Sequence, residues 1–149
     1  MDFKRFRRYL ADKFRVSEAF LFIGFVKERQ GLYDTLKSYG YKLIFKPTIV
    51  GNLGKPKGNV DAELVLYAAA IEFNNYDKAV VISSDGDFYC LYEFLERRQK
   101  LLKIVLPNRK TTSILLNRFG KYQFELIRDR EKIEREKKKN GRRGVLPLR

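Results

Sequence analysis

Short apolar segments alternate with amphipathic segments along most of the chain. The apolar segments are rich in β-branched and aromatic residues, which is typical of strands buried on both faces of a sheet. We predict such strands at 19–25, 41–45, 79–83 and 101–106, with an edge strand at 122–127. Because strands that alternate with helices favour parallel pairing, the sequence predicts an α/β domain: one mostly parallel sheet with helices on both faces.

The amphipathic segments carry apolar residues at helical spacing. They predict helices at 2–15, 32–39, 60–73, 86–98 and 111–119. Asp2 is expected to cap the first helix, and Gly40 to end the second. Residues 46–59 contain two prolines, three glycines and three lysines, which predicts a basic, flexible loop before the third helix.

The charge balance indicates a polyanionic partner. The 149 residues include 32 Lys and Arg against 18 Asp and Glu, a formal net charge of +14. A positive field favours nucleic acid first and an anionic membrane surface second, although basic residues also serve solubility alone. The apolar stretches are too short to cross a bilayer and the amphipathic N-terminus is unlike a secretory signal, so we expect a cytoplasmic protein without membrane contact.

The absence of histidine removes several kinds of catalytic site. Triads with an imidazole base, zinc–histidine sites and paired-histidine ribonuclease chemistry are all excluded. Proton transfer must therefore use a carboxylate, an amine, a phenol or a metal-bound water. The single cysteine, Cys90, excludes an intrachain disulfide and a cysteine-cluster zinc site, and its apolar surroundings predict a small core residue.

The end of the chain differs in composition from the rest. It is rich in basic residues and almost without an apolar face, and its first half could extend a helix through pairs of opposite charge. We predict a domain at 1–127 and a basic, partly helical to disordered tail at 128–149. Without an apolar face to insert, this tail fits a scaffold on a membrane less well than a nucleic-acid contact.

An apolar strand runs directly into two carboxylates, Asp85 and Asp87. In open parallel sheets the functional crevice lies beyond the carboxyl ends of the strands, which is where both side chains would project. Two acids this close repel each other unless one is protonated or a cation lies between them. Asp61, at the start of the preceding helix, would reach the same edge of the sheet. Three carboxylates there would suit Mg²⁺ or Mn²⁺.

An alternative explains the same acids without a ligand. Asp85 would cap the following helix, and Asp87 and Asp61 would complement helix dipoles. Glu63 and Glu72 fit solvated helix positions. Composition and spacing leave both interpretations open.

Two segments carry a family resemblance: KGNVD at 57–61 and SSDGDF at 83–88. With the order of elements from 2 to 127, they resemble the NYN domain of LabA-like proteins, in the PIN-like nuclease superfamily. The resemblance implies a Rossmann-like, three-layer PIN-like fold and a metal-dependent endoribonuclease that uses Mg²⁺ or Mn²⁺. It implies that Asp61, Asp85 and Asp87 are the metal-coordinating, catalytic acids.

The implied reaction is hydrolysis of RNA by in-line attack of a metal-activated water, which leaves a 3′-hydroxyl and a 5′-phosphate. Ser83 and Ser84 are expected to support the metal ligands or contact phosphate, and Ser84 replaces a glycine that is usual in the family. The loop that enters the site would bind the RNA backbone without reading sequence, through Lys46, Lys55 and Lys57. Four tyrosines either stack on unpaired bases of single-stranded RNA or pack within the domain: Tyr33, Tyr39, Tyr41 and Tyr89.

The resemblance breaks at the N-terminus. Family members begin with a strand that ends in an aspartate metal ligand, and this chain matches the family from its first helix onward. In the family's strand order that missing first strand lies between the strands at 19–25 and 79–83. We expect a gap there, direct pairing of those two strands, or a partner chain, for which a homodimer is one arrangement. Loss of one ligand would impair catalysis, so the alternative function is a noncatalytic RNA-binding module.

Overall fold

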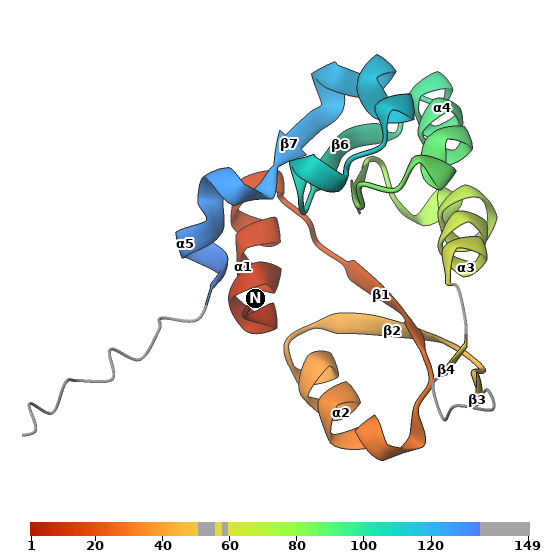
Figure 1. Ribbon diagram of the computed structural model, residues 1–149, viewed down its shortest axis with the longest axis vertical. Helices are drawn as coiled ribbons and strands as arrows, with labels where there is room; N and C mark the ends of the chain where they lie inside the picture. Colours follow the sequence, from red (N-terminus) through yellow and green to blue (C-terminus); the bar gives the residue numbers. More distant parts are fainter. Residues whose placement is uncertain (51–55, 58–59, 135–149) are drawn as a thin grey trace, which may run out of the picture.

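The strands form separate sheets rather than one (Figure 1). The computed structural model describes residues 1–50, 56–57 and 60–134. The largest sheet is parallel and has three strands: β5 (Ala79–Ile82), β6 (Leu101–Leu106) and β7 (Gln123–Glu125). A second sheet is the parallel pair of β1 (Ala19–Gly24) and β2 (Tyr41–Lys46). The third is a short antiparallel pair, β3 (Ile49–Val50) and β4 (Pro56–Lys57).

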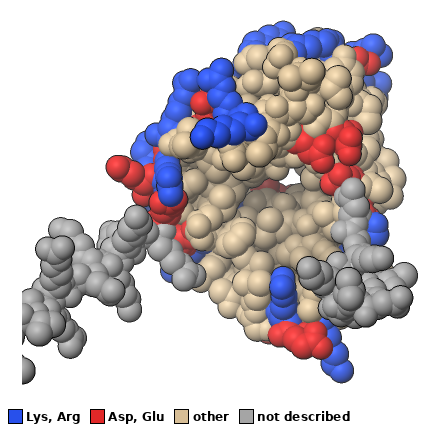
Figure 2. Space-filling view, in the orientation of Figure 1, with Lys and Arg blue, Asp and Glu red and all other residues tan. Residues whose placement is uncertain are grey.

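The α/β class and the parallel pairing are therefore confirmed. In the part of the chain that the structure describes, the parallel strands do not form one continuous sheet, in keeping with the gap expected as one alternative between the strands at 19–25 and 79–83. Among the described residues, no strand pairing joins β1 to β5, so direct pairing of these two strands does not occur. Figure 2 shows an opening through the molecule between the β1–β2 pair and the larger sheet. That a family strand is missing at this place stays a prediction.

The helices match the predicted positions closely. The α-helices are α1 (Phe3–Phe14), α2 (Gln30–Ser38), α3 (Asp61–Leu66), α4 (Tyr89–Arg97) and α5 (Arg130–Ile133). A π-helix, Tyr67–Ile71, continues α3. The 3-10 helices are Lys27–Arg29, Phe73–Asn75, Gly86–Phe88, Arg109–Thr111, Ile114–Tyr122 and Leu126–Asp129. As predicted, the Asp2 side chain accepts a hydrogen bond from the Arg5 N–H at 3.1 Å, and Gly40 follows α2 with a left-handed φ of 92°.

Helices cover both faces of the three-stranded sheet, as a three-layer fold requires. On one face, Phe6 and Leu10 of α1 pack against Val105 of β6. On the other face, Leu95 of α4 packs against Ile104 of the same strand. Adjacent residues of β6 thus point to opposite layers, because side chains alternate along a strand.

Helix α1 contacts both the three-stranded sheet and the β1–β2 pair. Its face packs on the three-stranded sheet, while the Phe3 carbonyl accepts a hydrogen bond from the Tyr41 hydroxyl of β2 at 2.7 Å. Helix α5 also packs on α1 through the buried Ile133. The boundary at 127 stays a prediction, and residues 135–149 of the predicted tail lie outside the described residues.

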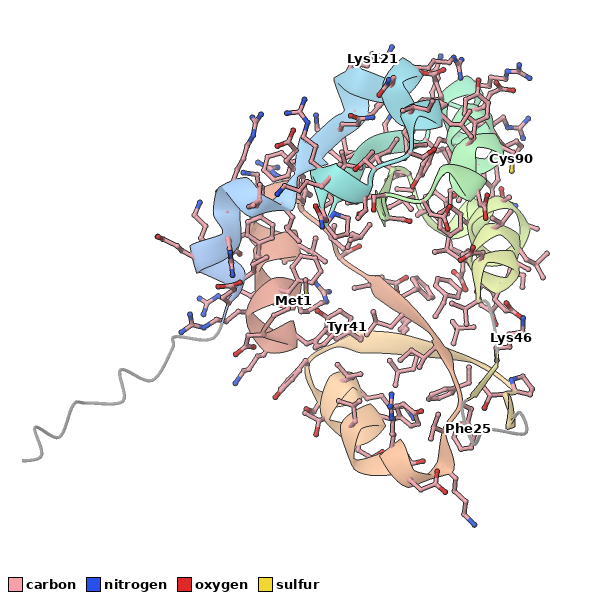
Figure 3. The ribbon with its side chains drawn as sticks, viewed as in Figure 1. Met1, Phe25, Tyr41, Lys46, Cys90 and Lys121 are labelled. Atoms are coloured by element: carbon pink, nitrogen blue, oxygen red, sulfur yellow. The ribbon has the colours of Figure 1, made fainter. Side chains whose placement is uncertain are left out.

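Two further observations concern the surface. Cys90 is exposed on the outer side of α4 (Figure 3), so the prediction that it is a core residue is wrong. Among the described residues, no helix is both long and apolar enough to cross a membrane.

Candidate functional site

A tight turn after β5 presents two of the predicted acids. The Ser83 N–H donates to the Val105 carbonyl at 3.1 Å, which continues the pairing of β5 with β6. The Asp85 N–H then donates to the Ser83 hydroxyl oxygen at 3.1 Å, and the Asp87 N–H donates to Asp85 Oδ1 at 2.9 Å. These bonds fix the turn and leave the Asp85 and Asp87 side chains exposed beyond the carboxyl end of β5.

Gly86 allows a second segment to close over this turn. A Cβ at Gly86 would lie 2.8 Å from the Ser113 Cβ, a separation that real side chains do not adopt. The Ser113 N–H donates to the Ser84 carbonyl at 3.2 Å, which holds the segment in place. Between them lies a cavity of about 560 Å³, lined by Ile82, Ser83, Ser84, Asp85, Gly86, Asp87, Pro107, Thr111, Ser113 and Leu115.

Three predicted acids meet at this edge of the sheet. Carboxylate oxygens of Asp61, Asp85 and Asp87 all lie within 4.8 Å of one another, although Asp61 comes from the start of α3. In octahedral coordination with Mg–O distances of about 2.1 Å, opposite ligands stand roughly 4.2 Å apart. The donor set is all oxygen and its spacing is close to that span, so these residues fit a divalent cation such as Mg²⁺ or Mn²⁺. Figure 2 shows acidic groups gathered beside the central opening.

The capping interpretation is confirmed for Asp85, and it does not compete with a ligand role. Asp85 caps the 3-10 helix that begins at Gly86, using Oδ1. A carboxylate has two oxygens, so one can accept the backbone bond while the other faces a cation. The cap also restricts the side chain and thereby orients the remaining lone pairs.

Glu63 is less exposed than the solvated helix position that the sequence predicted. Its side chain is only 28% exposed, and Oε1 lies 3.8 Å from the Lys46 Nζ. Among the described residues, Oε2 is buried without a hydrogen-bond partner. Glu63 is therefore not a solvated helix residue, and the α3 sequence could not reveal this, because the approach of β2 determines its burial.

The predicted RNA-binding lysines have different outcomes. Lys46 lies at the carboxyl end of β2, near the start of α3 (Figure 3), where it forms the ion pair with Glu63. Lys55 lies outside the described residues, and Lys57 belongs to β4 with a side chain outside the described set. A role in RNA binding stays a prediction for all three residues.

Of the remaining predicted residues, Ser83 and Ser84 line the cavity, and the four tyrosines are buried or half-buried. Tyr33 and Tyr41 are buried at 1% and 4% exposure, so they pack in the domain and are not available for base stacking. Tyr39 and Tyr89 are half-buried. The sequence did not predict Thr111 and the other cavity residues after β6 as part of the site. Their position after the carboxyl end of a strand was the only sequence feature that indicated them.

Comparisons with known proteins show the family and the fold of this chain. A family model described as the NYN domain matches residues 1–126. A crystal structure of a protein of unknown function from Vibrio parahaemolyticus has a similar fold, with a TM-score of 0.63 and 23% identity over 84% of this chain and 78% of that chain. A search of curated proteins gives no match. NYN domains belong to the PIN-like nuclease superfamily, whose members generally use divalent metals, and membership in the LabA-like group stays a prediction. Because the family model covers most of its length, this chain belongs to the NYN domain family.

Proposed function

We propose that this protein is a metal-dependent endoribonuclease that hydrolyses phosphodiester bonds of single-stranded RNA, with Mg²⁺ or Mn²⁺ as cofactor. The observation that carries this proposal is the convergence of Asp61, Asp85 and Asp87 oxygens within 4.8 Å at the carboxyl end of β5. Family membership and the net charge of +14 support it.

Different side chains of the site would bind the cation and the phosphate. Asp61, Asp85 and Asp87 would hold the cation. When bound, such a cation polarises a phosphoryl oxygen and lowers the pKa of a bound water, which suits a chain without histidine. The hydroxyls of Ser83 and Ser84, on the wall of the adjoining cavity, would hydrogen-bond phosphate oxygens.

The cavity and the surrounding charge fit a nucleotide chain. A volume of about 560 Å³ lies in the usual range for sites that hold a small ligand, so one nucleotide can enter. Lys46 pairs at 3.8 Å with Glu63, which lies in the first turn of α3 together with Asp61. Phosphate contacts of this kind position RNA without reading its sequence, so binding should weaken steeply with salt.

A noncatalytic RNA-binding module is the second candidate, and one observation favours it. Asp85 and Asp87 follow β5, whose edge is not paired with β1 in the described part of the chain. Asp85 and Asp87 are exposed there, so water competes for any cation they hold. A site of this kind could bind RNA without holding a cation firmly enough for catalysis.

Cleavage of end-labelled single-stranded RNA tests the proposal. Wild-type protein is expected to cut with Mn²⁺ or Mg²⁺, to stop with EDTA, and to leave 5′-phosphate ends. Asp85→Asn should slow cleavage about 100-fold or more, since a bound cation contributes several kcal/mol to the barrier. Asp77→Asn removes the same charge from an exposed acid outside the cluster and should cut normally. Folded protein that retards RNA but never cuts it would overturn the enzyme proposal and leave the binding module.

A further inference from the structure

A second surface cavity lies where helix α1 meets helix α5, away from the acid cluster. Its volume is about 600 Å³, and the described residues that line it are Arg5, Arg8, Tyr9, Asp12, Lys13 and Lys132. Figure 1 shows α1 and α5 side by side at one side of the molecule and α3, which begins with Asp61, at the other. The two cavities share none of their described lining residues.

The walls of this second cavity carry a net positive charge. Four of the six described lining residues are basic and one is acidic. Asp129, which pairs with Lys13 and Lys132, adds one more carboxylate beside them. Four cations against two carboxylates produce a local field that favours an anionic ligand.

Asp129 holds two of these cations in place. Its side chain is only 15% exposed, and its carboxylate oxygens lie 2.7 Å from Lys13 Nζ and 3.5 Å from Lys132 Nζ. The buried Tyr9 donates its hydroxyl to the same carboxylate at 2.7 Å. The Lys13 ammonium also lies 4.4 Å from the centre of the Phe124 ring. Because these contacts already order the ammonium groups, an anion that binds them loses little affinity to side-chain entropy.

Two arginines of α1 bring guanidinium groups to the same cavity. Arg5 and Arg8 are three residues apart and so lie on one face of the helix. Arg5 donates from Nη1 to the Glu134 carbonyl at 3.1 Å, which holds its side chain at the end of α5. Arg8 is 86% exposed, and its Nε lies 3.9 Å from an Asp12 oxygen. Such an exposed pair contributes little to stability, so Arg8 can exchange Asp12 for a phosphate.

We propose that this basic cavity binds a phosphodiester group of single-stranded RNA, as a second contact for the strand that the acids are proposed to cut. Guanidinium groups match the oxygens of a phosphate, and the volume is in the range that holds one nucleotide. The described lining residues include no aliphatic side chain that would enter a bilayer, which favours RNA over an anionic lipid. The inference rests on the proposed function for its choice of RNA, but it requires neither a cation nor cleavage.

RNA binding in EDTA tests this inference apart from cleavage. The probe is a fluorescently labelled single-stranded RNA of about 16 nucleotides, followed by anisotropy at several salt concentrations. The variant combines Arg8→Gln with Lys132→Gln, at side chains that are 86% and 67% exposed, so its melting temperature should stay close to that of the wild type. Each phosphate contact of a single strand contributes about 0.7 to the slope of log K against log salt, so the slope should fall by about 0.7 to 1.4 and the Kd at about 0.1 M salt should rise about 5- to 25-fold.

Arg97→Gln combined with Lys42→Gln is the matched control. It also removes one arginine and one lysine from surface ion pairs, which these residues form with Glu93 and Glu18. Arg97 ends α4 and Lys42 lies in β2, and neither lines either cavity. The control should keep nearly the wild-type Kd. Equal weakening in the two double variants would show that net charge alone matters and would overturn the inference.

Further outcomes separate this inference from the proposed function. Unchanged RNA affinity in the variant of Arg8 and Lys132, with RNA still cut when Mn²⁺ is added, would overturn the inference alone. Weakened RNA binding in that variant, with no cleavage by the wild type, would support the inference and overturn the enzyme proposal. A variant that keeps its RNA affinity but no longer binds vesicles rich in phosphatidylserine would assign the cavity to lipid instead. A wild-type protein that binds no RNA would overturn both proposals.

Discussion

The two halves of the molecule contain similar apolar strands, but the side chains of these strands are buried to different degrees. In the half built on β5, β6 and β7, helices cover both faces and the last three residues of β6 are fully buried. In the half built on β1 and β2, only the first residue of each strand is buried, and most of the others are half-exposed. An apolar strand therefore becomes a core strand only when both its faces and both its edges are occupied.

The acid cluster belongs to the better-packed half. Asp85 and Asp87 follow β5, and residues of α3 beyond Asp61 pack on the same hydrophobic core. The β1–β2 half reaches the site through the pair of Lys46 with Glu63, at 3.8 Å. It follows that damage to the β1–β2 half should spare cation binding more than damage to the other half does.

The largest expected difference concerns core leucines. Leu95→Ala, at a position of 0% exposure in α4, should destabilise the fold by about 2–5 kcal/mol. Leu21→Ala, in the half-buried β1, should cost about 1 kcal/mol, because less apolar surface returns to water. Urea denaturation measures both. Equal costs would show that the halves are packed alike, contrary to this comparison.

Two glycines, one in each half, differ in the space around them. Gly86→Ala should cost about 1–3 kcal/mol and weaken Mn²⁺ binding, because its Cβ would force Ser113 away from the turn. Gly31→Ala, in α2, meets nothing within 4 Å and should stabilise the protein by about 0.5–1 kcal/mol. Thermal melts and Mn²⁺ titrations distinguish the two variants. A Gly86→Ala variant with unchanged stability and Mn²⁺ affinity would show that the turn accommodates an added methyl group.

Amide hydrogen exchange compares the halves without mutation. Amides of β1 and β2 should exchange at least about tenfold faster than those of β5 and β6, because sparsely packed segments open at lower free energy. Mass spectrometry of peptides from the two regions measures this ratio. Uniform protection would indicate one cooperative unit.

The smallest expected effect is a pH dependence at Asp129. This carboxylate accepts hydrogen bonds from Lys13 Nζ and the Tyr9 hydroxyl, each at 2.7 Å, and chiefly the Lys13 bond lowers its pKa from 3.8 to about 2. A lowered folded pKa means that the unfolded chain binds more protons, so the contribution to stability is present above about pH 4 and disappears toward pH 2. Asp129→Asn should flatten the fall in the urea midpoint between these pH values. Asp77→Asn should retain the wild-type slope.

Local patterns predicted the elements, and sheet geometry predicted the acid cluster. The strands and helix α1 could be predicted because the spacing of apolar residues indicates which face of an element is buried. Asp61, Asp85 and Asp87 could be grouped from the sequence because the carboxyl ends of parallel strands meet at one edge. The NYN resemblance suggested divalent-metal nuclease chemistry as the function to propose for this cluster.

Features that depend on contacts between distant segments were not predictable. Strand composition alone does not show which edges pair, and the break between the strands at 19–25 and 79–83 was one of three arrangements expected from the family resemblance. Glu63 was expected in solvent because neighbours in α3 do not show the approach of Lys46.

Anomalous diffraction from crystals grown with Mn²⁺ shows whether the three aspartates form one cation site. A shared site predicts an anomalous peak within coordination distance of Asp61, Asp85 and Asp87, absent in crystals of Asp85→Asn. Ordered carboxylates without such a peak at saturating Mn²⁺, or a peak bound by other residues alone, would contradict it.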